Sequence, residues 1–144
     1  MAENDTVRLL RECDAGLRMG SDSLEEMAGY VKDPGLKKKL LDSKCEHEQL
    51  ISEVERELAD KGETGKEPAL MAKSMSWIKT NVKLATDYSD STVADLIYDG
   101  CFMGMKSLHR YKNQYVGADD TSKELTNRII NVEARLTENV QTYL

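Results

Sequence analysis

Apolar side chains near the start of the chain recur at alternating intervals of three and four residues. The positions that share this spacing are Leu10, Cys13, Leu17, Gly20, Leu24, Met27 and Val31. Residues spaced in this way lie on one face of an α-helix, and only Gly20 among them is not strongly apolar. The spacing returns near the end of the chain, at Leu125, Ile129, Val132, Leu136, Val140 and Tyr143. The sequence therefore predicts long helices that pack through one apolar face.

Capping and turn residues divide the chain into five expected helices. Asp33 is expected to cap a helix that has Pro34 in its first position, and Gly62 to end that helix in the left-handed conformation. Gly117 is expected to close a later helix, and Thr121 and Glu124 have the spacing of a capping box that would start the last one. The expected helices cover residues about 5–32, 34–61, 68–88, 91–116 and 121–144.

The third expected helix is shorter than the other four. Short turns join the first helix to the second and the fourth to the fifth, so each of these pairs is expected to form an antiparallel hairpin. We therefore predict an all-α fold with a single domain over residues 1–144, a four-helix bundle with an additional crossover helix. The crossover helix is expected to dock on the side of the bundle through a face that includes Trp77.

Composition and charge limit the class of protein and its partners. Of the 144 residues, 40% are hydrophobic and 32% charged, as in a globular domain. The net charge of -6 makes nucleic acid and anionic lipid unsuitable partners, because binding either needs clustered basic side chains. The acidic first residues and the absence of a long apolar run predict a cytoplasmic protein without a signal peptide or membrane segment. Three cysteines without a Cys-x-x-Cys pair are expected to be reduced thiols.

Several short motifs occur in a fixed order between about residues 6 and 115. They are Asp14-Ala15-Gly16, Asp33-Pro34-Gly35-Leu36-Lys37, Glu53-Val54 through Leu58 to Lys61-Gly62, Trp77-Ile78, Lys83-Leu84-Ala85 and Gly100. In these motifs the chain resembles the ferritin-like superfamily, and within it a bacterial family of small domains whose function is unassigned. The resemblance implies a bundle with a long crossover between its second and third core helices. It also implies a dinuclear metal site.

The ligands of such a site are missing from the sequence. A dinuclear iron site takes one Glu from each of two helices and Glu-x-x-His from each of the other two. The chain has two histidines and no Glu-x-x-His. Where the family would have glutamates stand Leu17, Cys45 and Cys101, of which Cys45 points away from the apolar face of its helix. We therefore expect no dinuclear metal site and no cofactor.

Three polar or reactive residues on the apolar faces are the remaining site candidates. Ser43 and His47 lie one turn apart on the second helix, and Cys13 lies on the first. His47 could be a lone metal or small-ligand contact, or a core histidine that bonds Ser43 or a tyrosine across the bundle. Cys13 could meet His47 or act as a small buried hydrophobe. A Cys–His nucleophile is disfavoured, because nothing supplies an oxyanion hole or a third orienting group.

The fourth expected helix has two apolar stripes. The stripe expected to face the bundle is Val93, Ile97, Gly100, Gly104, Leu108 and Tyr111. The second stripe, expected on nearly the opposite side and treated as a candidate interface, is Tyr98, Phe102, Met105 and His109. Either the third helix covers this stripe or another copy of the chain does, and the second alternative predicts a homodimer.

Two function classes fit these observations. The first is a non-catalytic ferritin-like bundle that binds or scaffolds, and the sequence favours it while leaving an enzyme open. The second is a metal-handling or oxidative-stress-related protein with a degenerate metal site at His47. No catalytic residue is assigned, since the sequence has no Gly-rich phosphate loop, nucleophile elbow or metalloprotease helix.

Overall fold

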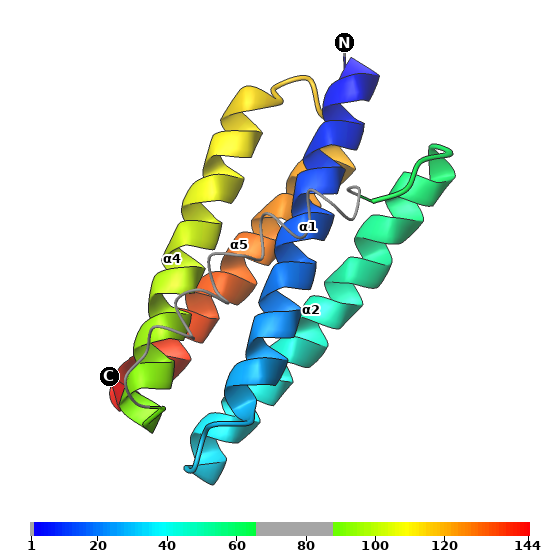
Figure 1. Ribbon diagram of the computed structural model, residues 1–144. Coiled ribbons are helices and arrows are strands. Elements are labelled where there is room, and N and C mark those ends of the chain that lie inside the picture. The colour runs from blue at the N-terminus through cyan, green and yellow to red at the C-terminus, as the bar shows by residue number, and fades with distance from the viewer. Residues whose placement is uncertain (1, 66–87) are drawn as a thin grey trace.

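Four long α-helices make up most of the structure, a computed structural model that describes residues 2–65 and 88–144 (Figure 1). The helices are α1 (Ala2–Ala28), α2 (Pro34–Asp60), α4 (Asp90–Gln114) and α5 (Asp120–Val140), followed by the 3-10 turn η1 (Gln141–Tyr143). The predicted all-α bundle is confirmed. The described residues contain four long helices rather than the predicted five. The predicted crossover helix, with Trp77, lies outside them except for Tyr88, which is not helical.

The helices form two antiparallel hairpins, α1 with α2 and α4 with α5, that lie side by side (Figure 1). At one end of the bundle, Arg11 of α1 donates to Glu63 just after α2. At the other end, Asp90 at the start of α4 accepts from the turn between α1 and α2. Helix α2 therefore ends at the opposite end of the bundle from the start of α4. The two helices therefore run in the same direction.

Local signals place most helix ends where the sequence predicts them. The Asp33 carboxylate accepts from the Leu36 N–H at 2.8 Å, and Gly62 adopts a φ of 70° after α2. Helix α1 ends at Ala28, four residues before the predicted end. The predicted capping box at the start of α5 is wrong, because Asp119 caps that helix by accepting from the Ser122 N–H. A carboxylate accepts this bond as well as a threonine hydroxyl does.

The buried core consists of two apolar clusters, one toward each end of the bundle. The first includes Leu10, Cys13, Leu17, Leu50, Val54, Leu108, Leu125 and Ile129. The second includes Leu24, Met27, Leu36, Leu40, Val93, Ile97, Cys101, Leu136 and Val140. Between the two clusters lies a gap of about one turn on α5, about two turns on α1 and α4, and nearly three turns on α2. The residues in that gap decide what the middle of the bundle contains.

Asp90 ties three segments together at one end of the bundle. Its two carboxylate oxygens accept from the backbone N–H groups of Lys32 and Asp33 at 2.8 and 2.9 Å. The Tyr143 hydroxyl, near the C-terminus, donates to Asp33 at 2.9 Å. The turn between α1 and α2 is thereby held to the start of α4 and to η1.

Replacing Asp90 by alanine should lower the free energy of unfolding by about 1–2 kcal/mol, because two backbone donors lose their acceptor. Asp120 is the matched control, since it is also the first residue of a long helix but accepts no such bonds from the residues that the structure describes. Asp120→Ala should change stability by less than about 0.5 kcal/mol. Urea unfolding measures both variants, and equal effects would show that Asp90 acts only through the helix dipole.

Candidate functional site

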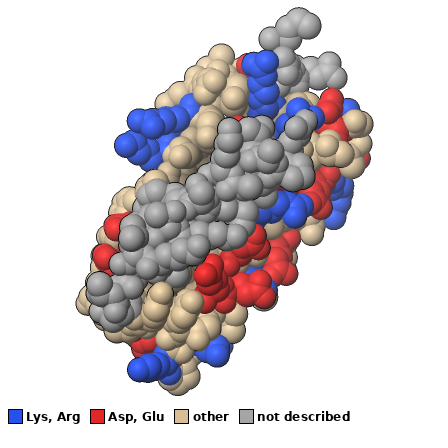
Figure 2. Space-filling view, in the orientation of Figure 1, with Lys and Arg blue, Asp and Glu red and all other residues tan. Residues whose placement is uncertain are grey.

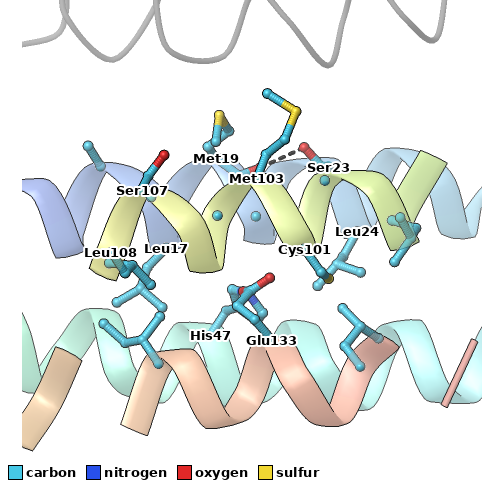
Figure 3. Close-up of a pocket in the computed structure, with 18 of the residues that line it drawn as sticks. Leu17, Met19, Ser23, Leu24, His47, Cys101, Met103, Ser107, Leu108 and Glu133 are labelled. Atoms are coloured by element: carbon cyan, nitrogen blue, oxygen red, sulfur yellow. Dashed lines mark hydrogen bonds and ion pairs between the residues drawn. The ribbon is translucent and has the colours of Figure 1, made fainter. Parts of the chain in front are cut away.

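His47 and Glu133 meet in the gap between the two apolar clusters. His47 of α2 is 1% exposed, and its Nε2 lies 2.7 Å from Oε1 of Glu133 on α5. Its Nδ1 lies 2.7 Å from the backbone carbonyl oxygen of Ser43, one turn earlier. Figure 3 shows both side chains rising between the helix pairs, with Leu17 and Leu108 on one side and Leu24 and Cys101 on the other. Both ring nitrogens of His47 are therefore occupied.

This geometry requires a proton between His47 and Glu133. A carbonyl oxygen only accepts hydrogen bonds, so Nδ1 of His47 must carry a proton and donate it to Ser43. At 2.7 Å, Nε2 and the carboxyl oxygen then share a second proton, as an imidazolium with a carboxylate or as a neutral imidazole with a carboxylic acid. Burial alone would lower the pKa of His47, but the hydrogen bond and charge of Glu133 outweigh it and raise that pKa above its usual value.

Cys101 completes a cluster drawn from three helices. Its buried thiol lies on α4, close enough to Glu133 for that carboxylate to affect its pKa. Burial, together with the neighbouring carboxylate, raises the pKa of Cys101 far above the usual range of a thiol. We refer to His47, Glu133 and Cys101 as the central polar cluster. Its thiol is protonated at neutral pH and is unsuited to act as a nucleophile.

Helix α1 has a glycine, Gly20, where it passes the cluster, and the absence of a side chain leaves room for His47. A Cβ atom at Gly20 would stand 2.8 Å from Nε2 and 2.9 Å from Cδ2 of His47, closer than real atoms pack. The glycine therefore allows the imidazole to lie against the α1 backbone. Each of the four helices thus places one residue at the centre of the bundle: Gly20 on α1, His47 on α2, Cys101 on α4 and Glu133 on α5.

The arrangement of the helices can be compared with known structures. The structure of YcfI from Rhodopseudomonas palustris superposes with a TM-score of 0.71, at 13% identity, over 99% of this chain and 94% of that one. Dps from Staphylococcus aureus superposes with a TM-score of 0.70, at 18% identity, over 97% of this chain and 93% of that one. The chain has the ferritin-like fold. No protein-family model matches the chain, and no curated protein matches it in sequence.

The dinuclear metal site that the ferritin-like fold implies does not fit the residues at the centre of this bundle. There the four helices contribute Gly20, His47, Cys101 and Glu133, of which only one is a carboxylate. The described residues hold no group of three or more His, Cys, Asp or Glu side chains that could bind a metal ion. The lone pair on Nε2 that a metal would need is directed at the proton shared with Glu133. The ferritin-like fold is present here with a protonated hydrogen-bonded pair at its centre.

The other two polar candidates, Cys13 and Ser43, lie in the core, and neither side chain has a hydrogen bond to the central polar cluster in the described part of the chain. The thiol of Cys13 pairs with the Thr126 hydroxyl at 3.2 Å, and burial raises its pKa to about 12. The hydroxyl of Ser43 is buried and has no hydrogen-bond partner within the described part of the chain. Ser43 instead meets His47 through its backbone carbonyl.

The interface candidates on α4 do not share one exposed stripe. Tyr98 is half-buried and packs against the second apolar cluster, and Met105 is half-buried as well. Phe102 is 50% exposed, although its ring also contacts that of Tyr98, and His109 is exposed. The prediction of a stripe opposite the core is therefore corrected. Phe102 is the large apolar side chain of this set that solvent reaches.

A cavity of about 270 Å³ lies above the cluster, between α1 and α4. His47, Glu133 and Cys101 form part of its wall, and glycines of α1 and α4 line the seam between the helices. Figure 3 shows Met19 and Met103 on the far side of these helices from His47.

No helix in the described residues has both the length and the apolar character that crossing a bilayer requires.

Gly20→Ala should lower the free energy of unfolding by about 1–3 kcal/mol, because the new methyl group must displace the His47 ring in a packed core. Gly16 is the matched control, one turn earlier on α1 and with no described atom within 4 Å of its Cβ position. Gly16→Ala should raise stability by about 0.5–1 kcal/mol through helix propensity. If urea unfolding finds the same change for both, the close approach of His47 to α1 is refuted.

The shared proton should make stability depend on pH near neutrality. Since the pKa of His47 is raised by folding, the stabilisation is complete below the ordinary histidine pKa of about 6.5. It is lost as the pH rises through the pKa of the folded protein. Urea unfolding of wild type and Glu133→Gln should therefore give a stability difference that shrinks with rising pH up to about 8, below the ordinary thiol pKa. A difference that stays constant or grows would contradict the shared proton.

Proposed function

We propose that this protein is a non-catalytic ferritin-like bundle that acts by binding protein surfaces, first of all a second copy of itself. One observation carries the non-catalytic part. Both nitrogens of His47 are engaged, by the Ser43 carbonyl and by Glu133, at the position where a catalytic bundle of this fold would need open metal ligands. The group at the centre is therefore used for packing the four helices.

The buried thiols support the same conclusion. The Cys13 thiol pairs with the Thr126 hydroxyl, the Cys101 thiol lies near Glu133, and burial raises the pKa of each thiol. A nucleophilic cysteine needs the opposite environment, with a lowered pKa and access to substrate. Neither thiol is suited to covalent or redox catalysis in the folded chain.

The surface of α4 supports self-association. Phe102 is half-exposed on the outer face of α4, near exposed charged side chains and the exposed His109. Burying an aromatic ring stabilises an interface more than burying most other side chains does. A surface that meets its own copy about a two-fold axis needs only one such patch on each chain. We therefore propose a homodimer through α4.

The competing function is metal handling at a degenerate site around His47. Protein purified from iron-supplemented cells should contain far less than one metal ion per chain by elemental analysis, because the ligand set is incomplete. His47→Gln is the control for adventitious metal, which should be equal in both proteins. About one or two iron or manganese ions per chain, lost in His47→Gln, would establish metal handling and overturn the proposal.

Phe102→Asp should convert the dimer to a monomer with unchanged helical content, since a carboxylate would have to be buried at the interface. Sedimentation velocity over a micromolar concentration series measures the assembly. Val116→Asp is the control, because Val116 is exposed but lies beyond the end of α4. A wild-type protein that is monomeric throughout the series would refute self-association, as would a dimer that Phe102→Asp leaves intact.

A further inference from the structure

The exposed face of α4 carries acidic side chains before Phe102 and basic side chains after it. Asp95 and Asp99 precede the ring, and Lys106 and Arg110 follow it, at helical spacings of three or four residues. All four charged side chains are exposed, and none has a hydrogen bond or ion pair within the described part of the chain. In Figure 2, basic and acidic side chains occupy separate stretches along the edge formed by α4. The face is thus acidic, aromatic and then basic along the helix.

No interaction among residues 2–65 and 88–144 accounts for this order. Asp95 and Asp99 are four residues apart, as are Lys106 and Arg110, and like charges at that spacing mildly destabilise a helix. The helix dipole favours acidic residues near the start and basic residues near the end, but its effect is confined to the first and last turns. Asp99 and Lys106 lie well inside α4, which runs from Asp90 to Gln114. The monomer therefore gains little from the pattern.

A two-fold axis beside Phe102 gives each of these charges an opposite partner. In an antiparallel pair of α4 helices, a residue three positions before the axis faces one about four positions after it. Asp99 then faces Lys106 of the partner subunit, and Asp95 faces Arg110 of the partner subunit. The rise of about 1.5 Å per residue leaves a mismatch of about one residue, which long basic side chains can span. The two Phe102 rings lie next to each other on the axis.

We propose that the chain forms an antiparallel two-fold homodimer through α4, centred on Phe102 and set in register by these four charges. The proposal rests on the self-association proposed above and adds its orientation and register. A parallel pairing would place acid against acid and base against base, which charge complementarity excludes. The partner that fits is a second copy, because the face is complementary to itself only when reversed.

The size and chemistry of the face predict a weak and salt-sensitive dimer. One half-exposed ring on each side, surrounded by solvated charges, is less than the apolar centre of a stable interface. Exposed ion pairs are screened as the Debye length falls from about 10 Å at 0.1 M to about 3 Å at 1 M salt. Raising the salt concentration over this range should therefore weaken self-association.

Charge reversal tests the register with three variants of the full chain. The first has Asp95→Lys with Asp99→Lys, the second has Lys106→Asp with Arg110→Asp, and the third has all four changes. In the first two, both halves of the interface become repulsive, so self-association should weaken at least about ten-fold. In the third, opposite charges again face each other, so the dimer should return to the wild-type dissociation constant within about three-fold.

Sedimentation velocity on each variant, and on an equal mixture of the first two, supplies the readout. The mixture should form a heterodimer, because every contact between the two chains is then between opposite charges. A dimeric wild type whose affinity is unchanged in the first two variants would overturn the register while leaving self-association standing. The same holds if the fourfold variant fails to associate although its circular dichroism spectrum is that of the wild type. A monomeric wild type would overturn both proposals.

Discussion

The hydrogen bond between His47 and Glu133 is the interaction on which the arrangement of the four helices depends. It joins α2 to α5 at the middle of the bundle. The Ser43 carbonyl on the preceding turn of α2 binds the other ring nitrogen, and Gly20 on α1 leaves room for the imidazole. A buried ion pair contributes little net stability compared with apolar side chains of the same size, but losing one partner is costly. We interpret the pair as fixing helix register. Sliding one helix by a turn would set Glu133 against one of the leucines that flank the cluster.

Because the pair serves packing, the same fold can hold different chemical groups at its centre. The helix arrangement matches Dps and YcfI over nearly the whole chain, while the sequence identity is 18% and 13%. A four-helix bundle needs only apolar stripes of the right spacing, and these are present on either side of the cluster. The middle layer is free to hold any group that satisfies its own hydrogen bonds. In this chain one imidazole and one carboxyl group satisfy each other.

Much of the fold could be predicted from the sequence because it depends on local and periodic signals. Asp33, Pro34 and Gly62 act within one turn of the chain, and the apolar stripes need only a regular helix. The partner of His47 was missed because it comes from a helix more than eighty residues away. The available signal was the position of Glu133, which lies beside Val132 and one turn after Ile129 on the buried face of α5. A carboxylate at such a position needs a buried donor, and the chain has just two histidines.

The exposed face of α4 could be predicted only in part for a related reason. Helical spacing places Tyr98 and Phe102 on the same row, but burial depends on which neighbouring helix reaches each of them. Tyr98 packs onto the second apolar cluster and Phe102 does not. The charge order around Phe102 is visible in the sequence, yet it becomes informative only when those four side chains are found exposed and without an ion pair in the described part of the chain.

Nitrogen NMR of the His47 imidazole tests most directly whether the centre of the bundle is closed by a shared proton. At neutral pH, Nδ1 should have the chemical shift of a protonated nitrogen, and Nε2 that of a nitrogen in a strong hydrogen bond to a carboxyl group. Both signals should stay in place when ferrous iron or zinc is added, whereas the exposed His109 is free to respond. An Nε2 with the shift of a free lone pair, or one that moves with stoichiometric metal, would show that the site is open and contradict the closed pair.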